Sequence, residues 1–111
     1  MNFKALFVET VRMAESLPAS LREHADDVTA LEEHRFDESY IAFLDAQIRL
    51  SPRGPEWTER LKHRRAALLS FTGVTLLRGR VQIGKVEFTV EIHPETRVVI
   101  HWEEYAPAGI K

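Results

Sequence analysis

The spacing of the apolar residues changes in the second half of the chain, and this change limits the fold more than any other feature. Up to about Phe71, apolar residues recur at three- and four-residue steps, which is the spacing of one face of a helix. From Val74 onward they alternate with polar residues, as Val86, Phe88 and Val90 do, which is typical of a strand with one buried face. Helices grouped before strands predict an α+β fold, in which helices pack on an antiparallel sheet.

About four helices are expected before this change of spacing. They are expected over residues 2–17, 19–31, 38–50 and 55–71. Asn2 and Asp37 are expected to cap the first and third helices, because a side-chain oxygen at this position accepts a backbone N–H. Two prolines and a glycine within residues 51–55 leave a short joint between the third and fourth helices, which predicts an antiparallel helical hairpin.

Three to four strands are expected after the helices, as an antiparallel meander over residues 74–83, 86–93 and 98–105. In the last strand, Val98, Ile100 and Trp102 are expected to share one face, because they alternate with their neighbours. The whole chain, residues 1–111, is predicted to be one domain. Its helical part covers residues 2–71, its β part covers residues 74–105, and a loose tail covers residues 106–111.

The composition is that of a soluble protein that buries a core, with 44% hydrophobic and 29% charged residues among 111. The absence of cysteine excludes disulfides, thiolate nucleophiles and cysteine-bound metals. No run approaches the roughly 20 apolar residues of a membrane span, and charged residues interrupt the N-terminal stretch where a signal peptide would be apolar. The expected location is therefore the cytoplasm, with no membrane partner.

The formal net charge of -2 hides a strong segregation of charge along the chain. Residues 1–50 sum to -5, residues 51–85 to +6 and residues 86–111 to -3. A weakly acidic chain is disfavoured as a direct nucleic-acid binder, since phosphates attract basic surfaces. The acidic stretches are suited to a basic protein partner instead. The alternative is that the acids are solvated, or pair within the chain with the basic run of residues 60–65.

The acidic stretches supply the candidate partner-binding residues. Tyr105 adds an aromatic side chain beside the acids, and aromatic side chains carry much of the binding energy at protein interfaces. The predicted surface consists of Glu23, Asp26, Asp27, Glu32, Glu33, Asp37, Glu87, Glu91, Glu103, Glu104 and Tyr105.

The sequence contains no motif of catalysis, metal binding or cofactor binding. Its serines lack the glycines of a nucleophile elbow, and it has no glycine-rich phosphate-binding motif. Adjacent acids such as Glu103 and Glu104 point in different directions, which makes them poor acid–base pairs. His93 and His101 are candidates to face each other across the last hairpin, where a surface pair is a more frequent outcome than a metal site. No catalytic residue, metal or cofactor is therefore expected.

Several traits together resemble the small immunity proteins of bacterial toxin systems such as contact-dependent growth inhibition. These traits are helices before a β-meander, the absence of cysteine, and acidic stretches at Glu23 to Glu38 and Glu87 to Glu104. The resemblance extends over the whole chain and rests on these general traits. It implies a non-enzymatic cytoplasmic inhibitor of a cognate basic toxin domain, often a nuclease, whose phosphate sites its carboxylates would fill.

Two other functions remain open. The order of helices and strands also resembles that of small RNA-cleaving toxins of the RelE/ParE type, which place basic residues on strands. The resemblance implies phosphate stabilisation or proton transfer by Arg78, Arg80, Lys85, His93 and Arg97. The net acidity of this chain departs from those strongly basic toxins. The third possibility is a regulatory or oligomerisation module that contacts an unrelated protein through an exposed aromatic residue.

Overall fold

A computed structural model describes residues 2–105 and confirms the α+β fold predicted from the sequence. These residues form four α-helices, one short 3-10 helix and one four-stranded antiparallel sheet. The elements are α1 (Phe3–Met13), α2 (Ala19–Glu23), β1 (Val28–Arg35), α3 (Glu38–Leu50), α4 (Pro55–Leu68), η1 (Leu69–Phe71), β2 (Thr75–Ile83), β3 (Val86–His93) and β4 (Val98–Tyr105). The predicted loose tail, residues 106–111, lies outside the described residues.

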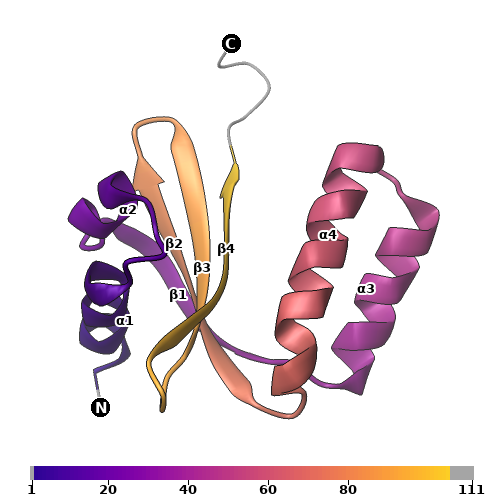
Figure 1. Cartoon of the computed structure of the whole chain (residues 1–111), viewed down its shortest axis with the longest axis horizontal. Helices are drawn as coiled ribbons and strands as arrows, with labels where there is room; N and C mark the ends of the chain where they lie inside the picture. The colour runs from indigo at the N-terminus through magenta and orange to yellow at the C-terminus, as the bar shows by residue number, and fades with distance from the viewer. Residues whose placement is uncertain (1, 106–111) are drawn as a thin grey trace. The chain divides into compact units, whose positions relative to one another are not determined.

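The chain forms two compact units, and the second is inserted into the sequence of the first (Figure 1). Unit 1 comprises residues 1–34 and 76–111 and contains α1, α2 and nearly all of the sheet. Unit 2 comprises residues 35–75 and contains α3, α4 and η1. Because β1 and β2 are neighbours in the sheet, the chain leaves unit 1 at the end of one strand and re-enters it on the strand beside it.

In unit 1, α1 and α2 pack on one face of the sheet (Figure 1). The strands follow the order β1-β2-β3-β4, so β1 and β4 are the edge strands. The core between helices and sheet consists of Leu6, Phe7, Val8, Val11, Leu17, Leu21, Ala25, Leu77, Val81, Phe88, Val90 and Ile92. Burial of a large apolar side chain is worth about 1.5–3 kcal/mol, so this layer is the main source of stability in unit 1.

The close approach of α1 to β2 depends on Gly79. A Cβ atom at this position would lie 2.3 Å from Cζ of Phe7, well inside contact distance. The Phe7 side chain is fully buried, and a densely packed core leaves its ring little room to move. Glycine therefore sets how closely the helix and the sheet can pack.

Unit 2 is the antiparallel helical hairpin predicted from the sequence (Figure 1). Asp37 caps α3 as predicted, because its Oδ1 accepts a hydrogen bond from the backbone N–H of Tyr40 at 3.0 Å. At the base of the hairpin, the backbone N–H of Gly73 donates to the carbonyl of Phe36 at 2.7 Å. Between the helices, the buried guanidinium of Arg64 donates to the Tyr40 hydroxyl and stands 5.1 Å from the centre of its ring.

One predicted helix is shorter than expected, and a strand follows it. The sequence predicted a helix over residues 19–31, but α2 ends at Glu23 and residues 28–35 form β1. The predicted helical part, residues 2–71, therefore contains a strand. Val28 and Leu31 do pack against the core of unit 1, so their spacing predicted burial correctly and conformation wrongly. The strand exists because β2 pairs with it, and local spacing cannot reveal a partner about 50 residues away.

The predicted alternation of Val98, Ile100 and Trp102 along β4 is also wrong. The register between β3 and β4 shifts by one residue beside Glu91, which indicates a bulge in β4. A bulge moves the following side chains to the opposite face. Val99 therefore packs with Trp102 against the core, whereas Val98 is exposed.

Candidate functional site

The face of the sheet opposite to α1 and α2 is polar along most of its length, and we call it the polar face. Strand register assigns its members, because the side chains of directly paired residues lie on the same face. The polar face consists of Arg78, Arg80 and Gln82 on β2, Glu87, Thr89 and Glu91 on β3, and His101, Glu103 and Tyr105 on β4, with Glu32 of β1 paired to Arg78.

One end of the polar face is a buried cluster of charges. Glu91 is only 1% exposed. Its Oε2 lies 3.6 Å from Nη2 of Arg78, and its Oε1 lies 3.9 Å from Nδ1 of His101. Arg78 also lies 3.7 Å from the carboxylate of Glu32. A buried carboxylate needs charged or hydrogen-bonding partners, so the cluster ties the four strands of the sheet together.

The other end of the polar face is more open. Nε of Arg80 lies 3.5 Å from Oε1 of Glu87, and these side chains are 51% and 36% exposed. Tyr105 lies opposite Glu87 and is 55% exposed. Glu103 lies opposite Thr89 and has no ion-pair partner among residues 2–105. Carboxylates beside an aromatic ring on paired strands suit the cationic side chains of another protein.

Five of the eleven residues predicted for the partner surface come together on the polar face. They are Glu32, Glu87, Glu91, Glu103 and Tyr105. Burial leaves Glu91 no surface for direct contact with a partner, so we assign it to the charged cluster. The remaining four are at least partly exposed and lie on β1, β3 and β4.

Three more of the predicted residues lie on strands or caps but not on the polar face. Glu104 lies opposite Phe88 and therefore on the side of the sheet that carries the helices, at its exposed edge. Glu33 follows Glu32 along β1, and strand alternation turns it away from the polar face. Asp37 belongs to unit 2, where its side chain caps α3.

The last three predicted acids lie at the end of α2 and directly after it, in unit 1. Asp26 forms an ion pair with Arg12 of α1. Oδ2 of Asp27 lies 2.9 Å from Nδ1 of His24. Glu23 is exposed at the end of α2. Two of the three acids are thus engaged within the chain, which reduces the charge that this stretch offers to a partner.

Sequence reasoning missed the charged cluster. The sequence singled out Arg78 only as a candidate for RNA cleavage, and His101 only as a possible neighbour of His93. The register instead places His101 opposite Glu91 and His93 opposite Val98, so the two histidines do not face each other. Alternation could have indicated which residues of each strand share a face, but only the register shows which of them meet.

The basic run on α4 is paired within unit 2. The ion pairs are Arg60–Glu56, Lys62–Glu59 and Arg65–Asp45, whose closest nitrogen and oxygen atoms are 3.9, 3.2 and 2.6 Å apart. The third arginine of the run, Arg64, is buried against Tyr40. These contacts favour the interpretation of the run as a solvated helix face whose charges are balanced locally.

Most of the strand residues considered for RNA cleavage are engaged as well. Arg78 and Arg80 pair with glutamates on the polar face. Nη1 of Arg97 lies 3.1 Å from Oε1 of Glu9 on α1. Nδ1 of His93 accepts hydrogen bonds from two backbone N–H groups of the following turn, at 3.2 and 3.3 Å. These contacts reduce the positive charge that the strands can offer to a phosphate backbone.

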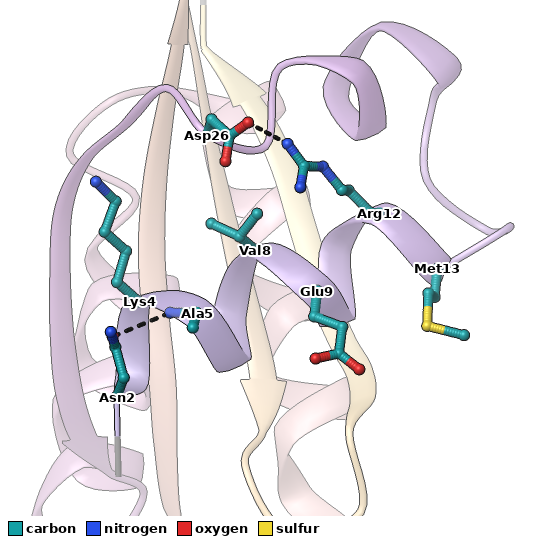
Figure 2. A pocket seen from close by; sticks show the side chains of 8 residues that line it. All are labelled: Asn2, Lys4, Ala5, Val8, Glu9, Arg12, Met13 and Asp26. Carbon is teal, nitrogen blue, oxygen red and sulfur yellow. Dashed lines mark hydrogen bonds and ion pairs between the residues drawn. The ribbon is translucent and has the colours of Figure 1, made fainter.

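A shallow pocket of about 530 Å³ lies along α1 (Figure 2). Figure 2 shows Asn2 at the start of the helix, where it caps α1 as predicted, and Arg12 pointing toward Asp26. Glu9, which also lines the pocket, pairs with an arginine of the last hairpin. Lys4 is then the one charged lining residue without an ion pair within the described residues, and a single exposed cation does not make a specific site.

Apart from a second open pocket of about 370 Å³ beside α2, lined by Arg12, Ala19, Arg22 and Glu23, the rest of the described chain adds no other candidate. Residues 2–105 contain no group of three or more side chains placed to hold a metal ion. None of the helices described in the structure is long and apolar enough to cross a membrane. Comparison with protein-family models, curated proteins and solved structures gives no match. The open end of the polar face is therefore the candidate functional site.

Proposed function

We propose that this chain is a non-enzymatic protein of the immunity type, which binds a basic toxin domain and blocks its active site. The contact surface in this proposal is the open end of the polar face. The observation that carries the proposal is the position of Glu103, an unpaired carboxylate, on the same face as the partly exposed side chain of Glu87 and the exposed side chain of Tyr105.

The geometry of these residues suits the inhibition of a nuclease. A nuclease active site presents cationic side chains and N–H donors to phosphate groups. Carboxylates held on neighbouring strands of one sheet compete for the same donors with little loss of side-chain freedom. Tyr105 adds apolar contact area to this charged surface, and anchors of this kind dominate binding energy at interfaces.

The charge of the polar face favours this function over RNA cleavage. The face carries two arginines and four glutamates, and both arginines pair with glutamates. A surface with a net negative charge repels the RNA backbone, whereas it attracts a basic protein at a rate that falls with ionic strength. The same charge supports a nuclease domain as the partner more than an acidic or neutral protein.

The test is a calorimetric titration of the chain with its cognate toxin domain, to be sought among the products of the genes beside its own, together with a nuclease assay of that domain. We expect a one-to-one complex, loss of nuclease activity at equimolar ratio, and weaker binding as salt is raised. A chain that leaves the toxin fully active, or that cleaves ribosome-associated RNA by itself, would contradict the proposal.

A further inference from the structure

We infer that the partner docks by adding a strand to the edge of β4, and that this strand carries two successive cationic residues. The inference rests on the proposed function and names the partner's mode of contact. The pairing is expected over His101–Tyr105, beside the open end of the polar face.

The first observation is the position of β4 in the sheet. In the order β1-β2-β3-β4, the last strand pairs with β3 on one side and with no other strand of the described chain on its second side. An edge strand presents a row of backbone N–H and carbonyl groups to which a strand of another protein can pair.

The second observation is where β4 is regular. From His101 to Tyr105, each residue has a partner on β3 in unbroken register, from Glu91 to Glu87. The register shift lies just before this stretch, and the twist of a bulge hinders pairing there. An added strand therefore has a regular template of five residues, His101–Tyr105, and meets the bulge beyond it.

The third observation is charge, and it separates the two edges of the sheet. The charged residues of β4 are all acidic, namely Glu103 and Glu104. The other edge strand, β1, mixes signs, since Glu33 is followed closely by Arg35. A strand rich in cations is attracted to β4, whose charged residues are all acidic. The same strand is repelled by the basic residue of β1.

The side chains of β4 define the partner strand further. Glu103 and Glu104 are successive and so point to opposite faces of the sheet. A strand paired beside them needs a cation on each face, which means two successive lysines or arginines. Trp102 and Tyr105 flank the two acids, so the partner strand is expected to place apolar or β-branched residues opposite them. The partner strand thus follows the pattern apolar, cationic, cationic, apolar.

The test measures amide hydrogen exchange in the full chain by NMR with a synthetic peptide as the probe. The peptide is Thr-Val-Lys-Lys-Val-Thr with blocked ends, and its control has the same sequence with every backbone nitrogen methylated. The control keeps the charges and side chains and removes the backbone donors. We expect the first peptide to slow exchange of alternate amides within His101–Tyr105 by about tenfold or more, and the methylated peptide to leave them unchanged.

A charge-exchanged pair provides the matched control. The variant Glu103→Lys/Glu104→Lys should lose the effect of the lysine peptide and gain protection from Thr-Val-Glu-Glu-Val-Thr. This exchange separates specific pairing at β4 from general attraction to an acidic protein.

Three results would overturn the inference. Equal effects of the methylated and unmethylated peptides would mean charge attraction without strand addition. Protection elsewhere, or none at saturating peptide, would mean that β4 accepts no strand. Protection in the free chain that increases with its own concentration would mean that a second copy occupies this edge. The proposed function is decided separately, because the toxin titration can succeed when the peptide experiment fails.

Discussion

Glu91 on β3 lies 3.6 Å from Arg78 on β2, and at 1% exposure it is the most buried charged residue of the polar face. The pair stands at one end of a surface whose other end is open to solvent around Tyr105. One face of a single sheet thus combines a structural charge cluster with a candidate binding surface. Substitutions at the two ends should therefore have different effects.

Replacing Glu91 by glutamine should destabilise the fold. The substitution keeps the size of the side chain but removes the charge that Arg78 and His101 face, so a partly buried guanidinium loses its closest counter-charge. We expect a loss of about 1–3 kcal/mol in the free energy of unfolding. Urea denaturation followed by circular dichroism measures this loss.

The matched control is Glu87→Gln, which removes the same charge at the open end, where Arg80 and Glu87 are both partly exposed. Exposed pairs contribute about 0–1 kcal/mol, so this variant should stay close to the wild type. A larger loss for Glu87→Gln than for Glu91→Gln would contradict the assignment of the two ends.

Replacing Gly79 by alanine should destabilise unit 1 through overpacking. The new Cβ would meet the fully buried ring of Phe7 at 2.3 Å, so α1 must move away from β2. Overpacking of this kind costs about 1–3 kcal/mol, which thermal unfolding can measure. The double variant Phe7→Leu/Gly79→Ala should lose less stability than the sum of the two single variants, because the smaller side chain leaves room. Simple additivity would show that the two residues do not compete for space.

Replacing Asp37 by alanine tests a residue that the sequence offered for both capping and partner binding. Its side chain accepts a hydrogen bond from the backbone N–H of Tyr40 at 3.0 Å. Loss of such a cap lowers the free energy of unfolding by about 1 kcal/mol. We expect this loss in urea denaturation and unchanged affinity for the toxin domain. The neighbouring exposed residue provides the control, since Glu38→Ala should change neither quantity by much. If the Asp37→Ala variant binds the toxin domain more weakly under conditions in which it is fully folded, unit 2 is part of the interface.

Local sequence patterns predicted most of the fold. The change from helical to alternating spacing near Val74 separates the helical hairpin from the last three strands. The caps at Asn2 and Asp37 are confirmed because capping depends on residues only three positions apart. The hairpin of α3 and α4 was predicted from the short, proline-rich joint between the two helices.

Features that depend on distant pairing were not predictable. The strand β1 owes its conformation to β2, which follows it only after the whole of unit 2. The charged neighbours of Glu91 depend on the register of three strands, and the exposure of Val98 depends on a bulge. The sequence proposed ten acids by charge, together with Tyr105, as partner-binding residues, whereas the register separates a structural acid, Glu91, from an unpaired one, Glu103.

The central claim is that the open end of the polar face binds a basic toxin domain. The most direct test is a titration of that domain with two variants that each remove two negative charges from unit 1. The variant Glu87→Gln/Glu103→Gln changes the polar face, and Glu15→Gln/Glu95→Gln changes exposed acids outside it. We predict that the first variant binds the toxin domain at least about tenfold more weakly, which is a loss of about 1.4 kcal/mol in binding free energy. The second variant should bind less than about twofold more weakly than the wild type. Equal weakening by both variants, or none by the first, would contradict the claim.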